Sequence, residues 1–236
     1  MAEILSVYRT ENKYIISKKD LSNLMFKLDK ILKRDNHSKM QAYKVRSLYF
    51  DSINNIDFKT KLAGTEIRKK IRIRTYDAQS EKCKLEMKQK NGDLQHKISM
   101  WITKEDAKEL INRNYSVLTK YFEENKVAIE FYTTMLMGVY GPVALIEYDR
   151  IAYTYNLNNT RITFDMDVRA SESNYDIFSE NPIYTKVIDE SDTILEIKYD
   201  NKLVDFISDV FKPYKLTRTS VSKYCIGRKV FYDFNF

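Results

Sequence analysis

Basic side chains alternate with apolar ones along residues 68–90, which read RKKIRIRTYDAQSEKCKLEMKQK. With the two-residue period of a strand, one face of the first half carries Lys70, Arg72, Arg74 and Tyr76. The second half repeats the pattern with Lys84, Glu86, Lys88 and Lys90. Like charges side by side repel, so a row of cations on a predicted hairpin is costly unless water, counterions or an anionic ligand offset it. The pattern therefore favours a polyanionic ligand.

Three glutamates recur close to lysines on the predicted strands. Glu11, Glu86 and Glu196 each lie on a predicted strand, two residues before a lysine, and the last of these lysines is Lys198. A divalent cation needs oxygen ligands, while the remaining oxygens of a phosphate chain need Lys and Arg. The pattern therefore indicates a site for a metal and a phosphate chain together.

The composition predicts one domain over residues 1–236, because 236 residues with 43% hydrophobic content can form one large core. The net charge of +7 favours anionic partners without choosing among them. Cys83 and Cys225 have no metal-ligand spacing, which indicates neither a disulfide framework nor a zinc site and favours a reducing compartment. Because we find no signal peptide and no membrane segment, we expect a soluble cytoplasmic protein.

Alternating patterns predict further strands, and helical spacing predicts helices that could cover their apolar faces. Besides the hairpin, the predicted strands are Val7–Ile16, Tyr43–Asp51, His96–Ile102, Pro142–Tyr155, Arg161–Arg169 and Leu195–Asp200. The predicted helices are one capped by Ser17 and ending near Arg34, a turn at 57–62, one capped by Thr103, two within 115–140 that form core packing, and 203–211. Ser222 begins either a strand end or a C-terminal helix.

Two α+β architectures fit these elements. In one, an open antiparallel sheet packs its apolar face on helices and leaves its charged face in water. In the other, the sheet closes into a barrel, with the helices outside and the charged faces lining a wet bore. Alternation alone does not choose between them.

Eight short segments follow one another as YRTENKY, SLYFD, RIRTYD, LEMKQK with the lysine of HKISM, IEYDR, RITFD, LEIKYD and SKYCIGR. In this order and strand phase they resemble the VTC domain of polyphosphate polymerases, within the triphosphate tunnel metalloenzyme superfamily. The resemblance spans nearly the whole chain. It implies an α+β fold with a closed, antiparallel eight-stranded tunnel barrel and helices packed outside. It also implies a nucleoside triphosphate (ATP) substrate, Mn²⁺ or Mg²⁺ as cofactor, and transfer of the terminal phosphate to a growing polyphosphate chain.

The resemblance also implies roles for individual residues. The phosphate contacts would come from Lys13, Arg72, Arg74, Lys88, Lys97, Arg150, Arg161, Ser222 and Lys223. The four arginines, with Lys223, would clamp the reacting triphosphate, Glu196 would hold the metal, and Tyr148 would meet the nucleotide. Hydrolase and cyclase relatives begin with Glu-x-Glu-x-Lys, whereas Arg9 replaces the first glutamate here. The loss of that carboxylate favours the polymerase branch.

Three other functions stay open at this stage. A domain of this fold could hold polyphosphate or inositol phosphates without turnover, or it could be a triphosphatase that releases orthophosphate. A nucleic-acid binder would need exposed aromatic side chains between the basic ones, and we do not expect nucleic acid as a partner.

For Lys90 and Arg169 we expect ordinary surface ion pairs worth ~0–1 kcal/mol.

Overall fold

The computed structural model describes residues 9–38, 41–92 and 94–232, which form two compact units. Of the described residues, the first unit takes those up to Lys44, together with 148–168 and 188–221. The second unit takes the described residues within 45–147, 169–187 and 222–232. Strands β7 (Gly141–Tyr155) and β8 (Thr160–Ser171) each run from one unit into the other. Among the described residues, every helix is too short or too polar to span a bilayer.

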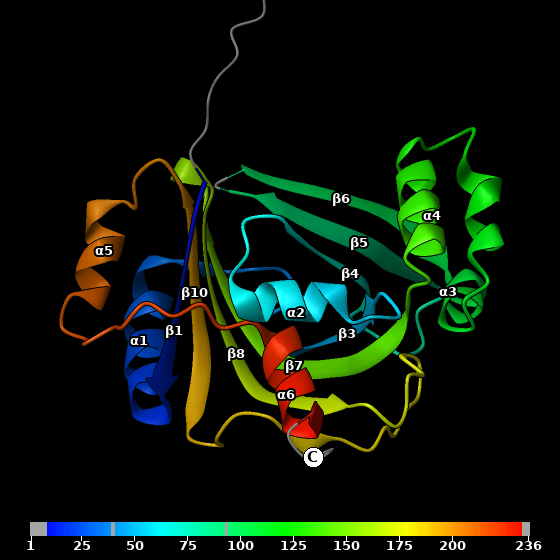
Figure 1. Ribbon diagram of the computed structural model, residues 1–236. Helices are drawn as coiled ribbons and strands as arrows, with labels where there is room; N and C mark the ends of the chain where they lie inside the picture. Colours follow the sequence, from blue (N-terminus) through cyan, green and yellow to red (C-terminus); the bar gives the residue numbers. More distant parts are fainter. Residues whose placement is uncertain (1–8, 39–40, 93, 233–236) are drawn as a thin grey trace, which may run out of the picture. The chain divides into compact units, whose positions relative to one another are not determined.

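The first unit is an antiparallel sheet with helices on its apolar face. Its strand order is β1-β10-β8-β7, where β1 spans Arg9–Ser17 and β10 spans Asp192–Asp200, and β2 (Lys33–Arg34) adds to β7. A short turn, η2 (Leu157–Asn159), joins β7 to β8. Helices α1 (Lys18–Ile31) and α5 (Asp205–Phe211) lie beside β1 and β10 (Figure 1). Their buried side chains share one core with the apolar faces of β7, β8 and β10, which leaves the opposite face to polar residues.

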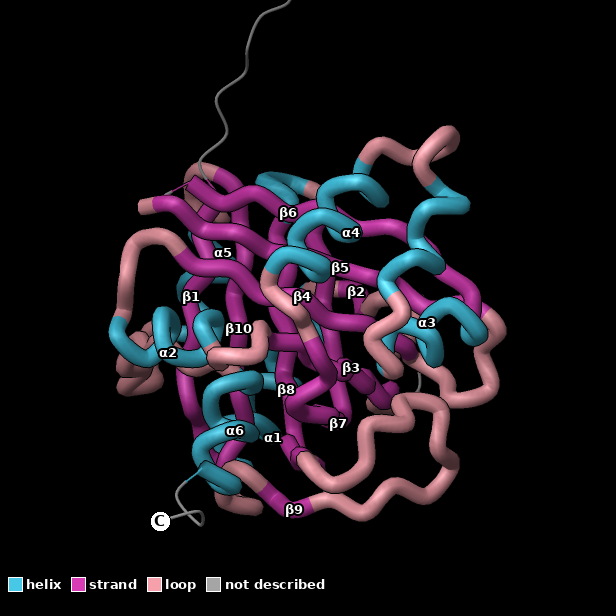
Figure 2. Tube along the Cα trace, turned by 45° about the vertical axis from the view of Figure 1, so that its right-hand side comes forward, coloured by secondary structure: helices cyan, strands magenta, loops and turns pink. Residues whose placement is uncertain are grey.

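The second unit has the strand order β7-β3-β4-β5-β6, with β9 (Thr185–Lys186) added to β8. Its strands are β3 (Tyr43–Asp51), β4 (Arg68–Thr75), β5 (Lys82–Asn91) and β6 (Leu94–Thr103). Helices α3 (Lys104–Ile111), η1 (Tyr115–Tyr121) and α4 (Val127–Met137) form a core with the apolar faces of β4, β5 and β6. Two further helices, α2 (Ile56–Ala63) and α6 (Lys223–Tyr232), lie next to each other (Figure 2).

The predicted elements are confirmed, with small shifts at their ends. The Ser17 hydroxyl caps α1 by accepting from Asp20 N at 3.1 Å, and Thr103 with Asp106 forms a capping box on α3. Helix α1 stops at Ile31 because the next residues pair with β7. Ser222 begins a helix, the second of its two alternatives. Val7 of the first predicted strand lies outside the described residues.

The α+β class with an antiparallel sheet and helices is confirmed, but the closed barrel is wrong. Over the described residues the strand order begins at β1 and ends at β6, and these two strands do not pair with each other. At the outer edge of β1, the carbonyl of Lys13 accepts instead from Thr219 N at 2.8 Å. Alternation tells which side chains share a face, whereas closure depends on which chain segment pairs with the last strand.

The regular alternation predicted for 161–169 is interrupted inside β8. Asp167 has a φ of 47° and an exposed side chain, so the two-residue period does not continue through it. Beyond this point Arg169 binds Glu147, a carboxylate that is 2% exposed. The expectation that Arg169 forms an ordinary surface ion pair is therefore wrong.

Candidate functional site

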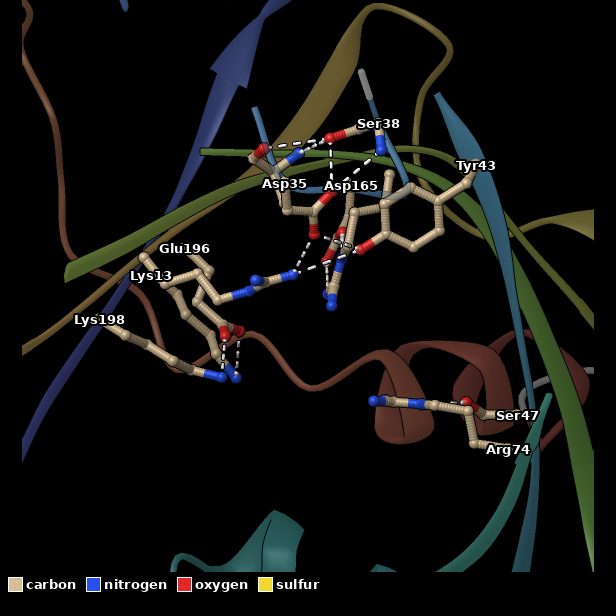
Figure 3. Close-up of polar contacts among 12 residues, drawn as sticks. Lys13, Asp35, Ser38, Tyr43, Ser47, Arg74, Asp165, Glu196 and Lys198 are labelled. Carbon is tan, nitrogen blue, oxygen red and sulfur yellow. Dashed lines mark hydrogen bonds and ion pairs between the residues drawn. The ribbon is translucent and has the colours of Figure 1, made fainter. Parts of the chain in front are cut away.

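Four charged side chains on β1 and β10 of the first unit alternate in sign. We call Glu11, Lys13, Glu196 and Lys198 the first-unit cluster. Glu196 accepts from Lys198 at 2.5 Å and from Lys13 at 3.4 Å (Figure 3). Glu11 lies 2.9 Å from Lys13 and 3.8 Å from Lys198. The antiparallel register creates this arrangement because it sets Glu11 opposite Lys198 and Lys13 opposite Glu196.

Lys13 remains charged in this cluster although it is largely buried. Burial lowers the pKa of its ammonium group, but Glu196 and Glu11 outweigh burial and raise the pKa above its ordinary value of 10.5. Two ammonium groups face two carboxylates, so the first-unit cluster is balanced in charge. Lys13 and Lys198 must therefore give up part of their contacts with these carboxylates before they can bind a phosphate.

The two predicted arginines of the first unit also have carboxylate partners. Arg150 donates Nε and Nη2 to Asp165 at 2.6 and 2.8 Å, and its guanidinium lies 5.2 Å from the ring centre of the buried Tyr148. Arg161 donates to Asp35 at 2.7 Å, and Tyr43 lies 3.4 Å away (Figure 3). These hydrogen bonds hold both guanidinium groups in fixed orientations.

The residues around Glu196 fit a hard divalent cation. Within the described residues no three His, Cys, Asp or Glu side chains gather closely enough to hold an ion alone. Mg²⁺ usually takes only one or two carboxylates and completes its shell with water and substrate phosphates, and Glu11 and Glu196 match that set. Thr163, which the register places opposite Glu196, has a buried hydroxyl with no hydrogen-bond partner among the described residues. This hydroxyl can therefore form a hydrogen bond with a ligand beside the two carboxylates.

The second unit carries three cross-strand rows of polar side chains on β4, β5 and β6, which we call the cationic rows. The register aligns Lys70 with Lys88 and Lys97, Arg72 with Glu86 and Ser99, and Arg74 with Lys84 and Trp101. These rows place six cations against one carboxylate. In contrast to the first-unit cluster, they carry a large excess of positive charge.

Glu86 is the counter-ion at the centre of the cationic rows. It accepts from Arg72 Nη2 at 2.7 Å and from Lys97 at 2.5 Å, and Arg74 Nη1 lies 3.7 Å away. Burial raises the pKa of this carboxyl, but Arg72, Arg74 and Lys97 together lower it to about 2. Glu86 is therefore ionised and offsets part of the repulsion between its neighbours.

Arg74 is held more loosely than Arg72. Its side chain is 11% exposed, and its contacts are long, at 3.4 Å to Ser47 Oγ (Figure 3) and 3.7 Å to Glu86. Arg72 by contrast makes close bonds to both Glu86 and Tyr49. A largely buried guanidinium with long contacts can gain a ligand while losing little.

Helix α6 brings Ser222 and Lys223 to the same unit. The Ser222 hydroxyl accepts from Lys70 Nζ at 2.7 Å and from Cys225 N at 3.4 Å, so it caps the helix while contacting the first cationic row. Lys223 is the first helical residue, and Lys88 is exposed between Lys70 and Lys97. Every predicted residue thus lies on a charged strand face or at the start of α6.

The residues that orient these cations were not given roles by sequence reasoning. Asp165 was visible in the alternation of RITFDMD but not as the partner of Arg150. Asp35 lies in a loop without a pattern, and Tyr49 looked like any aromatic residue of a strand. Their roles depend on pairings between distant segments, for which a single sequence carries no signal.

Comparison with solved structures shows that the fold is a known one. Two solved structures described as proposed adenylate cyclases are similar in fold. The one from Bacillus halodurans is 13% identical, with 90% of this chain and 92% of that chain covered and a TM-score of 0.52. The one from Vibrio parahaemolyticus is 12% identical, with 93% and 97% covered and a TM-score of 0.51. No curated protein sequence matches.

The sequence model of the VTC domain matches residues 8–232, which include both the first-unit cluster and the cationic rows. The resemblance of the eight short segments is therefore confirmed, and the chain belongs to the VTC domain family.

Proposed function

We propose that this chain is a polyphosphate polymerase, which transfers the terminal phosphate of ATP to a growing chain of inorganic polyphosphate. The observation that carries the proposal is the excess of six cations over one carboxylate in the cationic rows. Such an excess on neighbouring strands is unfavourable without an anion, and a phosphate chain supplies successive charges. Membership of the VTC domain family supports the same substrate class.

Arg74 is the cation best prepared to bind phosphate in this proposal. Its guanidinium can donate two parallel hydrogen bonds to phosphate oxygens, and its present contacts are long. Arg72 is already oriented by Glu86 and Tyr49, so its side chain loses little conformational entropy when a phosphate binds. Lys88 and Lys97, which face each other across β5 and β6, would extend the contacts along the chain.

The reaction in this proposal is an in-line phosphoryl transfer. A terminal oxygen anion of polyphosphate attacks the γ-phosphorus of ATP, a new P–O bond forms, the bond to the β-phosphate oxygen breaks, and ADP leaves. The attacking oxygen is already ionised, so no side chain has to remove a proton. The protein contributes by positioning both substrates and by stabilising the charge that spreads over the transferred group.

Glu196 and Glu11 are the residues that would hold Mn²⁺ or Mg²⁺. A bound divalent ion would neutralise phosphate oxygens and help to align the two substrates. With these carboxylates on an ion, Lys13 and Lys198 would exchange carboxylate oxygens for phosphate oxygens. Lys13 is kept protonated by its surroundings, which suits it to this exchange.

Two alternatives predict different products. The cationic rows could bind polyphosphate without turnover, because their charge excess does not depend on the carboxylates of the first-unit cluster. A two-metal triphosphatase is less favoured, because Arg9 stands where those relatives have a glutamate and donates to Asp200 at 3.1 Å.

The test incubates the purified chain with ATP and Mn²⁺ or Mg²⁺, then measures polyphosphate on stained gels together with ADP and orthophosphate. A ladder of polyphosphate with matching ADP is expected. Orthophosphate without polymer would identify a triphosphatase. Retained polyphosphate binding with no product would identify a binding module, and either result would reject the polymerase.

Replacing Arg74 by Ala should weaken tripolyphosphate binding by about tenfold to a hundredfold, because a charge-assisted hydrogen bond contributes roughly 1.5–3 kcal/mol. The control is Arg34→Ala. Arg34 also binds a carboxylate through Nε and Nη2, both at 2.8 Å from Asp29, but it lies on β2, outside the cationic rows. Titration calorimetry should find the control unchanged, and equal losses in both variants would contradict the assignment.

A further inference from the structure

The hydroxyl of Tyr49 lies among the cations of the second unit. Tyr49 is 6% exposed and stands directly opposite Arg72 in the register of β3 and β4. Its oxygen accepts from Arg72 Nη1 at 3.0 Å, and the guanidinium carbon lies 5.8 Å from the centre of its ring. This tyrosine therefore contacts Arg72 with both its hydroxyl and its ring.

The ring of Tyr49 is held in turn by α6 and α2. It stacks on Tyr224 with centroids 5.0 Å apart and planes inclined by 23°, and Phe58 meets the Tyr224 ring edge-on at 6.0 Å. The Tyr224 hydroxyl donates to Asp51 Oδ2, which also accepts from Phe58 N at 2.9 Å at the start of α2. Three packed rings and one buried carboxylate thus leave Tyr49 little freedom to move.

The charges around Tyr49 come mainly from β4. Burial raises the pKa of the Tyr49 phenol, but Arg72, Arg74 and Lys70 outweigh burial and lower the pKa to about 8. On the side of α6, burial and Asp51 raise the pKa of the Tyr224 phenol far above its ordinary value. Within this stacked pair, Tyr49 alone changes its charge in the mildly alkaline range.

We infer that Tyr49 is a positioning residue for Arg72, whose guanidinium it fixes between its own hydroxyl and Glu86 in the orientation that binds a phosphate. The inference rests on the proposed function. A neutral phenol orients the guanidinium without neutralising its positive charge, which then attracts the phosphate. A phenolate would neutralise that charge, so phosphate affinity should fall as pH rises through the titration of Tyr49.

The test compares wild-type chain with Tyr49→Phe, which keeps the ring and its stacking but removes the hydroxyl. Tripolyphosphate affinity is measured by calorimetry from pH 7 to pH 9.5. At pH 7 the variant should bind about three- to tenfold more weakly, because one hydrogen bond that orients Arg72 is lost. The affinity of the wild type should fall about tenfold over the alkaline range, whereas that of the variant should stay nearly flat.

Tyr184→Phe is the matched control, since it also removes a partly buried tyrosine hydroxyl in the second unit, one that donates to Glu147 at 3.2 Å. This variant should keep the pH profile of the wild type. Ultraviolet titration gives an independent readout: a phenol that titrates near pH 8 should disappear in Tyr49→Phe, and bound tripolyphosphate should move its titration to higher pH in the wild type.

The outcomes separate two failures. If the wild type does not bind tripolyphosphate at any pH, the proposed function falls and this inference falls with it. If the wild type binds and Tyr49→Phe has the same affinity and the same pH profile, the proposed function stands and the positioning role is wrong. Thermal unfolding of each variant at pH 7 shows that the compared chains are folded.

Discussion

An arginine on a strand of this protein either is open to a ligand or stabilises the fold, and its partners distinguish the two roles. Arg74 has long contacts and is therefore open to a ligand, whereas Arg46 donates to Glu147 at 2.7 Å and to the carbonyl of Ser179 at 2.6 Å. Arg169 shares the same carboxylate. Both kinds of arginine alternate along strands in the same way, so residue type and period do not separate a ligand-binding cation from a structural one.

Replacing Glu147 by Gln should destabilise the protein by roughly 3–5 kcal/mol at pH 7, because two largely buried guanidinium groups lose their shared charge partner. Burial raises the pKa of the Glu147 carboxyl, but Arg169 and Arg46 outweigh burial and lower it below its ordinary 4.5. A depressed pKa stabilises the fold above pH 4.5, and this contribution is lost as pH falls through the folded-state value.

Urea denaturation of wild type and Glu147→Gln from pH 7 down to pH 3 measures this effect. The difference in unfolding free energy should be largest at neutral pH and should shrink in acid, where Glu147 of the wild type becomes protonated. Glu66→Gln, at an exposed glutamate, should differ little from the wild type at any of these pH values. A Glu147→Gln difference that stayed constant with pH would contradict the assignment of the charge effect.

At the scale of elements, the sequence predicts most strands and helices because each buries one face. The hairpin of β4 and β5 has the predicted faces, and Ser17 and Thr103 cap their helices as predicted. Closure of the sheet was not predictable, because it depends on the segment near Thr219 pairing with β1. The interruption at Asp167 was hidden as well, since an aspartate fits an unbroken alternation equally well.

Gly227 in α6 allows the close approach of this helix to β7 and β8. A Cβ at this position would lie 2.4 Å from Ile146 Cδ1 and 3.2 Å from Ala170 Cβ. Gly227→Ala should therefore destabilise the second unit by about 1–3 kcal/mol, although alanine favours helix by ~1 kcal/mol. Because α6 carries Ser222 and Tyr224, tripolyphosphate binding should weaken as well.

The control for Gly227→Ala is a double-mutant cycle with Ile146→Val, which removes the crowding Cδ1 atom. Ile146→Val alone should cost about 0.5–1.5 kcal/mol through the cavity it leaves. Combined with Gly227→Ala, it should restore part of the lost stability, as measured by chemical denaturation. Strictly additive losses would mean that contact with Ile146 is not the cause.

At the scale of the whole molecule, the net charge of +7 is unevenly distributed. The first-unit cluster pairs each ammonium group with a carboxylate, whereas the cationic rows align six cations with one carboxylate. Polyanion binding should therefore begin with the second unit and weaken with salt, because exposed charges are screened within about 10 Å at 0.1 M ionic strength.

Tripolyphosphate and single-stranded DNA should affect this molecule differently. Trp101, the sole tryptophan, is 57% exposed and ends the third cationic row, where a stacked base would quench its fluorescence. If the chain is built for phosphate chains, tripolyphosphate should protect Lys13 and Lys223 from acetylation measured by mass spectrometry. An oligonucleotide at the same phosphate concentration should protect them weakly and quench Trp101 little. Strong quenching with equal protection by DNA would favour a nucleic-acid ligand, because stacking on an aromatic ring contributes about 1–3 kcal/mol per base and a phosphate chain offers no base to stack.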